Sequence, residues 1–229
     1  MFNGIKGWFG WLAINQQCVL CHQLSKALVC PYCFADLPRF NMQNEAQNLL
    51  CNPKILRELK VINFDRLFAM SEYQWPYSYL LSGLKFNRKV VFAQALSELF
   101  CHLELAHTDL PKALVPIPLH PSRMASRKYN QASIIGKNIA KHYCLKFLPQ
   151  TLQRVVNSQA QTRLNSAQRM KNAQGIFTMA HELDVDHIAI FDDVITTGAT
   201  VGAAVDAIRA QFPDIKIDVW ALCITPERR

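Results

Sequence analysis

Apolar residues follow two spacings along most of this sequence. Short apolar runs with the length of buried strands lie at 66–73, 113–118, 145–149, 187–191 and 216–224. Segments whose apolar residues recur at helical spacing separate several of them, at 77–86, 88–105 and 201–212. Strand alternating with helix is the order of a parallel sheet covered on both faces. The pattern therefore predicts an α/β fold.

Proline and polar residues interrupt this pattern in three places. Pro116 and Pro118 end the second run, so 120–131 is expected to be a loop leading into a helix that ends near His142. Residues 34–62 form a polar connector, and 155–180 are the least regular part. We therefore expect an N-terminal module over 1–40, a connector over 41–62 and the α/β domain over 63–229.

The first residues form no membrane span. Apolar side chains at helical spacing favour a short amphipathic helix docked on the protein over a membrane contact: Phe2, Ile5, Trp8, Phe9 and Leu12. No apolar run approaches the roughly 20 residues that cross a bilayer, and no small-residue cleavage site follows this segment. We expect no stable membrane insertion.

Positive charge is concentrated in one stretch. The chain has a net charge of +8, and no acidic residue occurs between Asp109 and Glu182. Eleven cations fall in that interval: Lys112, Arg123, Arg127, Lys128, Lys137, Lys141, Lys146, Arg154, Arg163, Arg169 and Lys171. The positive charge favours an anionic partner, which is a phosphorylated metabolite, a nucleic acid or an anionic membrane surface. The alternative is a solvated basic surface.

Four of the eight cysteines have the spacing of a metal site. They form C-x2-C-x8-C-x2-C, which predicts a structural tetrathiolate zinc site at Cys18, Cys21, Cys30 and Cys33. A redox pair and an iron–sulfur site are the alternatives, and contact with nucleic acid is a further use of such knuckles. The other cysteines are scattered in apolar contexts, which indicates a reducing, cytoplasmic location.

The segment IAIFDDVITTGAT carries the strongest sign of a ligand site. A buried strand at 188–191 precedes Asp192 and Asp193, which we expect at its carboxyl end. A turn into a helix follows and is made of Thr196, Thr197, Gly198, Ala199 and Thr200. Hydroxyls and backbone N–H groups at a helix N-terminus bind anions, and paired carboxylates accept hydrogen bonds from sugar hydroxyls or help to hold Mg²⁺. The alternatives are an ordinary capped loop and a Walker B strand, for which the chain lacks a phosphate loop.

IFDDVITTGAT resembles the phosphoribosyl pyrophosphate signature of type I phosphoribosyltransferases. The resemblance implies a Rossmann-like domain in which Asp192 and Asp193, the candidate catalytic residues, contact the ribose hydroxyls. It also implies that the loop 196–200 holds the 5-phosphate, with Mg²⁺ accompanying the ligand.

A longer resemblance covers nearly the whole chain. The cysteine module, LKFNRK, VPIPLHPSRMASRKYNQA and QTRLNSAQRMKNAQGIF together resemble the ComF family of competence-associated proteins, which includes GntX-like proteins. Family members often show Arg-Gly-Phe-Asn-Gln, so Arg127, Asn130 and Gln131 match here, whereas Lys128 and Tyr129 depart. The resemblance implies a role in natural transformation, in which such proteins handle incoming single-stranded DNA on the cytoplasmic side.

The same resemblance assigns the basic residues. Arg123 and Arg127 fall where type I phosphoribosyltransferases place their pyrophosphate loop. A guanidinium donates bidentate hydrogen bonds to phosphate oxygens, so both residues are candidates for diphosphate contacts. Arg163 falls in the irregular segment that would correspond to the mobile catalytic flap of these transferases. The same segment contains Gln161, Arg169 and Asn172. The alternative interpretation is a solvated loop.

Three functions follow from these features. The first is a competence protein that binds a phosphoribosyl pyrophosphate type of ligand and single-stranded DNA. The second is an active transferase that moves phosphoribose to a nucleobase or other acceptor, although the sequence identifies no general base. The third is a transcriptional or assembly partner whose cysteine module docks on another protein, such as other competence or DNA-processing proteins.

Overall fold

The computed structural model describes residues 16–40, 48–103, 105, 109–155 and 175–225. The chain divides into two compact units, residues 1–37 and 38–229. In the first unit, β1 (Gln16–Gln17) pairs antiparallel with β2 (Leu24–Ser25), and α1 (Pro31–Ala35) follows. The helix expected between Phe2 and Leu12 lies outside the described residues.

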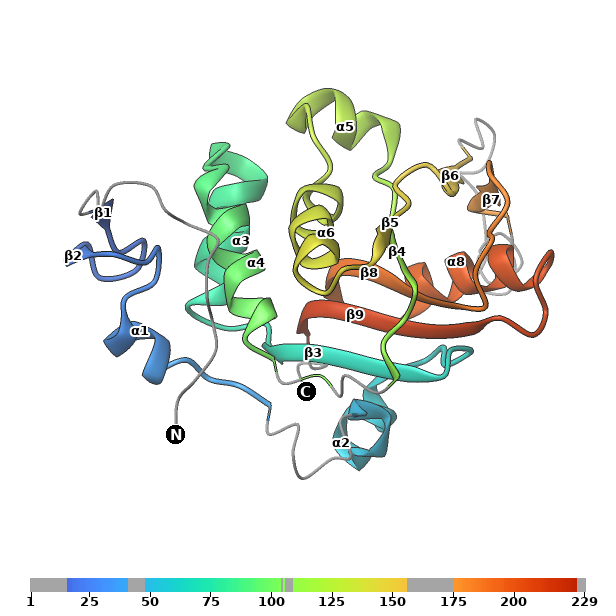
Figure 1. The fold of residues 1–229 in the computed structure, drawn as a ribbon, viewed down its shortest axis with the longest axis horizontal. Coiled ribbons are helices and arrows are strands. Elements are labelled where there is room, and N and C mark those ends of the chain that lie inside the picture. The colour runs from blue at the N-terminus through green and yellow to red at the C-terminus, as the bar shows by residue number, and fades with distance from the viewer. Residues whose placement is uncertain (1–15, 41–47, 104, 106–108, 156–174, 226–229) are drawn as a thin grey trace, which may run out of the picture. The chain divides into compact units, whose positions relative to one another are not determined.

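The second unit is built on a five-stranded parallel sheet (Figure 1). Its strands are β3 (Arg66–Glu72), β4 (Ala113–Pro116), β5 (Lys146–Phe147), β8 (His187–Ile195) and β9 (Lys216–Ile224). Their order in the sheet is β3-β9-β8-β4-β5, and every pairing is parallel. The predicted α/β fold with a parallel sheet is confirmed.

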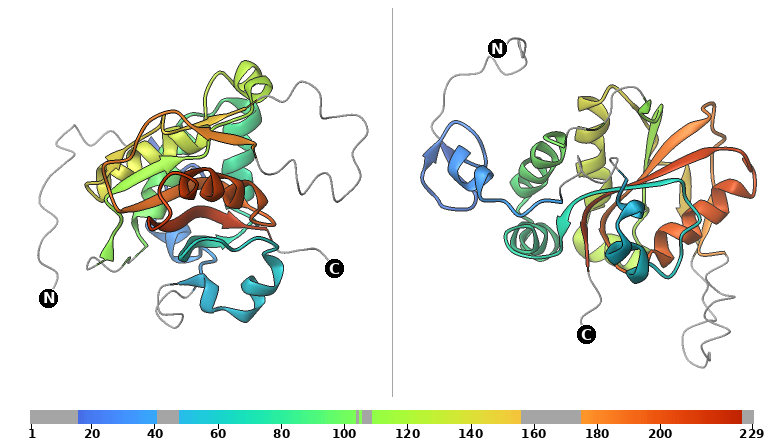
Figure 2. Two further views of the ribbon diagram at one scale, coloured as in Figure 1. Left: turned by 90° about the vertical axis from the view of Figure 1, so that its right-hand side faces the viewer. Right: turned by 90° about the horizontal axis from the view of Figure 1, so that it is seen from below.

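Helices cover both faces of this sheet (Figure 2). One face carries α3 (Tyr77–Asn87), α4 (Val91–Cys101) and α6 (Gln131–His142), and the other carries α8 (Ala199–Arg209). On the first face, Phe100 of α4 packs edge-on against Phe191 and lies 5.7 Å, between ring centroids, from Trp220. Burial of these rings provides the core that holds the strand ends in place.

The chain order changes direction between β4 and β8. From β4 the chain moves outward to β5, and then returns to form β8 and β9 on the opposite side. Pairing of β4 with β8 ends at Pro116 and Phe191, while β8 continues to pair with β9 as far as Ile195. A crevice therefore opens at the carboxyl ends of these strands, where open α/β sheets bind ligands.

The loop expected over 120–131 is wrong for residues 121–127, which are helical. They form the helix α5 (Pro121–Arg127), with proline at its first position. The His120 ring accepts a hydrogen bond from the Ser122 N–H at 3.3 Å, and Lys128 ends the helix with a left-handed φ of 69°. A proline is favourable at the start of a helix, because the N–H it lacks has no helical partner there.

Two other segments differ from the sequence expectations. Residues expected as connector contain the 3₁₀ turn η1 (Leu49–Cys51) and α2 (Pro53–Glu58), capped by the side chains of Asn48 and Asn52. The strand expected at 188–191 runs on through both aspartates to Ile195. The strands β6 (Leu152–Arg154) and β7 (Phe177–Met179) form a separate antiparallel pair. Among the described residues, no helix combines the length and apolarity of a membrane span.

Candidate functional site

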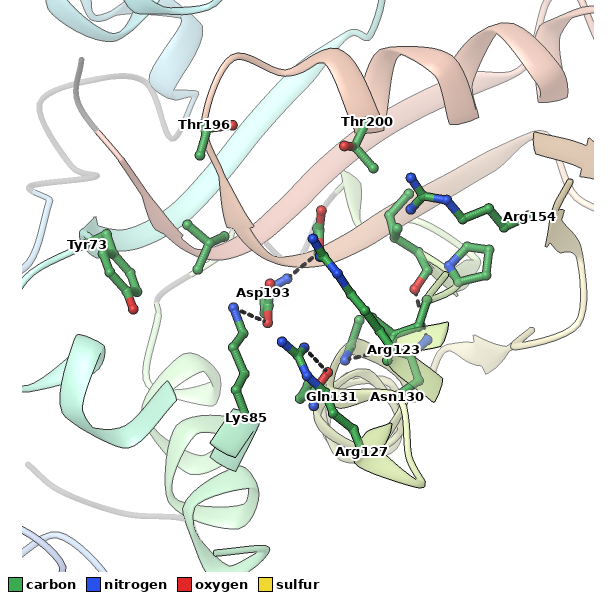
Figure 3. Close-up of a pocket in the computed structure, with 16 residues that line it drawn as sticks. Tyr73, Lys85, Arg123, Arg127, Asn130, Gln131, Arg154, Asp193, Thr196 and Thr200 are labelled. Atoms are coloured by element: carbon green, nitrogen blue, oxygen red, sulfur yellow. Dashed lines mark hydrogen bonds and ion pairs between the residues drawn. The ribbon is translucent and has the colours of Figure 1, made fainter. Parts of the chain in front are cut away.

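A pocket of about 380 Å³ lies at the crevice between β4 and β8 (Figure 3). β8 contributes Asp192 and Asp193, and residues 117–119 after β4 form another part of the wall. Cationic side chains arrive from three further elements: Lys85 of α3, Arg123 and Arg127 of α5, and Arg154 of β6. The fold thus gathers two acids and four cations from segments far apart in the sequence.

The two aspartates have different partners. Nζ of Lys85 lies 2.8 Å from Oδ2 of Asp193, and the Asp193 backbone N–H donates to Oδ1 of Asp192 at 2.8 Å. Burial, reinforced by the charge of Asp193, raises the pKa of Asp192 to about 7, against the opposing effects of Lys85 and Arg154. At neutral pH, Asp192 can therefore both accept and donate hydrogen bonds.

The threonine loop follows directly from β8. Thr196 and Thr200 line the pocket, at the side opposite Lys85 and Arg127 in Figure 3. Thr197, Gly198 and Ala199 do not line it, but they shape the turn that begins α8. The hydroxyls of the two lining residues, together with the start of α8, form a polar wall suited to an anion.

Gly198 lies close to the backbone of Val61 in the same domain. It has a left-handed φ of 79°, and an added Cβ would lie 2.7 Å from the carbonyl oxygen of Val61. The Lys60 N–H donates to the Thr197 carbonyl at 3.0 Å, and a Cβ on Gly202 would lie 2.3 Å from Cγ1 of Val61. Residues 60–61 thus support the loop from the side away from the pocket.

The arginine side of the pocket is organised by α5 and the start of α6. Nη1 of Arg127 donates to Oε1 of Gln131 at 3.2 Å. Asn130 caps α6 through its side-chain oxygen, and its Nδ2 donates to the Ile117 carbonyl at 2.8 Å. These contacts fix the distance between the wall after β4 and the helix that carries Arg127.

Four residues of the expected flap lie outside the described residues: Gln161, Arg163, Arg169 and Asn172.

The cysteine module brings its four thiols together in the first unit. The Sγ atoms of Cys18, Cys21, Cys30 and Cys33 lie within 4.8 Å of one another, and those of Cys21 and Cys30 are 3.7 Å apart. A tetrahedral zinc with bonds of about 2.3 Å separates its sulfurs by about 3.8 Å. The donor set therefore fits a metal such as zinc, without a contribution from His22.

Backbone N–H groups favour the thiolate form of Cys18, whereas burial raises the pKa of Cys33. The Cys30 N–H donates to Cys18 Sγ at 3.3 Å, and the Cys33 N–H donates to Cys30 Sγ at 3.4 Å. Burial acts to raise the pKa of Cys18, but hydrogen bonds from neighbouring backbone groups lower it to about 6. A thiol that ionises readily is a ready metal ligand.

Comparison with known proteins identifies the family. The chain is 28% identical over 223 residues to "Competence protein F" of Haemophilus influenzae, covering 92% of this chain and 91% of that protein. It is 30% identical over 167 residues to "DNA utilization protein YhgH" of Salmonella typhimurium, covering 71% and 73% respectively. The chain belongs to the ComF family. No protein-family model matches it.

Lys85, Arg154 and Tyr73 line the pocket of this ComF-family protein but were not assigned a role from the sequence. Lys85 lies in LKFNRK, a segment that marked the family resemblance but indicated no function. Arg154 belongs to the acid-free band, and its pKa is lowered by burial and by the nearby Arg123. Tyr73, directly after β3, carries no sequence signal. Only the fold brings these side chains to the aspartates.

Proposed function

We propose that this ComF-family protein acts in competence or DNA utilization by binding a phosphoribosyl pyrophosphate type of ligand and handling incoming single-stranded DNA in the cytoplasm. The names of its relatives support the biological role. The observation that carries the ligand assignment is the pocket that joins Asp192 and Asp193 to the threonine loop and to four cations. A phosphorylated pentose needs both kinds of partner.

Each part of such a ligand has matching groups in the pocket. Asp192 and Asp193 would accept the ribose hydroxyls, and Thr196 and Thr200 would bind the 5-phosphate with the backbone at the start of α8. Lys85, Arg123, Arg127 and Arg154 would balance the diphosphate charge. The volume of about 380 Å³ falls in the range of about 300–1,000 Å³ usual for small-molecule sites.

Mg²⁺ and zinc would have separate places in this function. The carboxylate oxygens of the aspartate pair are the donors that Mg²⁺ prefers, and the ion would supply charge neutralisation of the diphosphate. Zinc in the cysteine module would hold residues 16–37 in a fold that hydrophobic burial is too limited to stabilise. A site with four thiolates keeps no open position for chemistry.

Calorimetric titration tests the ligand assignment. Phosphoribosyl pyrophosphate with Mg²⁺ is titrated into the wild-type protein, into the double variant Asp192→Asn plus Asp193→Asn, and into Asp214→Asn as an exposed control. We expect binding to the wild type and the control, and a loss of at least about tenfold in the double variant, equivalent to about 1.4 kcal/mol. No binding to the wild type, or equal binding by all three, contradicts the assignment.

Anisotropy of a labelled oligothymidylate tests the DNA role independently. Neutralised phosphates dominate such affinity, so we expect it to fall steeply as salt is raised. Absence of binding at low salt, or affinity that does not change with salt, rejects the DNA role and leaves the ligand assignment standing.

One observation favours an active transferase as a second candidate. The pKa of Asp192 is raised to about 7, which suits a general base at neutral pH. In that reaction the bond from C1 of the ribose to pyrophosphate breaks, a bond from C1 to the acceptor forms, and the acceptor's proton passes to the base. Exchange of labelled pyrophosphate into the donor, assayed with a panel of nucleobases, distinguishes the two candidates. Retained ligand binding without exchange rejects the transferase.

A further inference from the structure

An exposed aromatic ring stands at the end of α3, next to the pocket. Phe86 is 72% exposed, whereas its neighbour Lys85 turns inward to Asp193. A phenylalanine this exposed gains little of the stabilisation that burial of its ring would give, so the ring is available for contact with a ligand. Adjacent positions of one helix thus present a cation to the pocket and an apolar ring to solvent.

Several cations lie at the same two helix ends as this ring. Arg88 and Lys89 follow it after Asn87, and Lys128 stands at the end of α5; all three are exposed. Neither α3, α5, α6 nor the segment 88–90 contains an acidic residue. Within the part of the chain that the structure describes, no carboxylate pairs with these three cations. We call Phe86, Arg88, Lys89, Arg127 and Lys128 the Phe86 surface.

Contacts between the two helix ends make this surface a single structure. The guanidinium carbon of Arg127 lies 5.5 Å from the centroid of the Phe86 ring, and the Tyr129 hydroxyl donates to the Leu84 carbonyl. Arg88 and Lys128 have left-handed φ values of 54° and 69°, and each ends its helix. Arg127 is therefore held beside the ring, whereas Nζ of Lys89 lies over the neighbouring rings of Phe92 and Tyr79, 5.1 and 5.8 Å from their centroids.

An exposed ring near cations that no described carboxylate neutralises matches single-stranded nucleic acid. An unstacked base offers a face to the ring, and its phosphates offer negative charge to the cations. A protein partner would have to desolvate these charges in order to cover one phenylalanine. A duplex hides its base faces, which leaves the ring without a partner.

We propose that the Phe86 surface binds single-stranded DNA, with a base stacked on Phe86 and phosphates held by Arg88, Lys89 and Lys128. This inference rests on the DNA-handling role proposed above and locates it on the molecule. Arg127 lines the ligand pocket and also lies over Phe86, so the strand passes along the rim of the pocket.

Anisotropy with a labelled oligothymidylate of about 16 nucleotides, the upper size of one single-strand site, tests the surface. Phe86→Ala is expected to bind about tenfold more weakly, because base stacking on one ring contributes on that scale. Phe86→Trp should bind like the wild type. The control is Trp75→Ala: Trp75 is 66% exposed but lies before the start of α3, and the helix separates its first residue from Phe86 by about 14 Å.

Charge removal gives a second readout. The variant Lys89→Gln plus Lys128→Gln should lower the slope of log affinity against log salt by about 1.4, since each phosphate contact of a single strand contributes about 0.7. Melting temperature and titration of phosphoribosyl pyrophosphate establish that each variant is folded.

The outcomes separate this inference from the proposed function. If the wild type binds DNA but Phe86→Ala and the charge variant bind like it, the Phe86 surface is rejected and the DNA role stands. Equal losses in Trp75→Ala and Phe86→Ala also overturn the surface. If the folded wild type fails to bind single-stranded DNA at low salt, both the DNA role and the surface are rejected.

Discussion

Nζ of Lys85 lies 2.8 Å from Oδ2 of Asp193, and both side chains are largely buried at the wall of the pocket. This pair sets the charge that an incoming ligand meets, because Lys85 neutralises one of two adjacent carboxylates. Without the ammonium group, the aspartates would repel an anion more strongly.

Replacing Lys85 tests this balance. Lys85→Met should weaken binding of phosphoribosyl pyrophosphate by at least about tenfold, whereas Lys85→Arg should retain part of the affinity. Lys112→Met is the matched control, because Lys112 is exposed and pairs with Asp186 near the amino end of β4. Calorimetry measures all three, and an affinity for Lys85→Met equal to that of the wild type would show that the pair has no part in binding.

Stability should fall with rising pH through the titration of Asp192. Its pKa is raised from 3.8 to about 7 in the folded state, so the folded protein holds this proton more tightly than the unfolded chain. The contribution is favourable at low pH and is lost as pH rises between those two values. Urea unfolding across this window should show a smaller decline for Asp192→Asn than for the wild type. Parallel declines in the two proteins would contradict the assignment.

Gly198 should tolerate no side chain. Gly198→Ala combines a left-handed φ with a Cβ placed 2.7 Å from the Val61 carbonyl, and should destabilise the protein by about 1–3 kcal/mol. Ligand binding should weaken as well, because Thr196 and Thr200 are positioned by the same turn. Gly175→Ala is a suitable control, since Gly175 also has a positive φ but has nothing within 4 Å of an added Cβ. Chemical denaturation and calorimetry compare the two variants; equal effects would exclude the contact with Val61 as the cause.

The cysteine module should lose its metal and its local fold when one thiol is removed. Cys21→Ser is expected to abolish stoichiometric zinc in the purified protein and to expose residues 16–37 to proteolysis. Cys51→Ser, which changes an exposed cysteine outside the cluster, should retain the metal. Metal analysis with limited proteolysis provides the measurement. Full zinc content in Cys21→Ser would show that the four thiols do not form the site.

The parts that local sequence patterns govern were predictable. The strands at 66–73 and 216–224 and the helix at 77–86 follow from apolar spacing, and the cysteine motif follows from ligand spacing. The helix α5 was missed because the preceding Pro116 and Pro118 suggested a loop, while the cap that starts it depends on the His120 ring. Apolar content also suggested that the strand ended at Phe191, whereas pairing with β9 carries it on to Ile195.

The composition of the pocket was only partly predictable. Asp192, Asp193, Thr196, Thr200, Arg123 and Arg127 were named from one motif and one basic segment, and they line one cavity. Lys85 and Arg154 were not, because their approach depends on how α3 and β6 pack against distant strands. The sequence around either residue contains no chemistry that distinguishes it from a surface cation.

The support of the threonine loop by Val61 has a consequence for dissecting this protein. Asn63 extends the contact, since its side chain donates to the Gly202 carbonyl and its own carbonyl accepts from Arg209. A fragment begun at β3 would retain all five strands of the sheet, yet it would lack the backbone against which the glycine turn rests. Truncations meant to isolate ligand recognition should therefore begin upstream of Lys60.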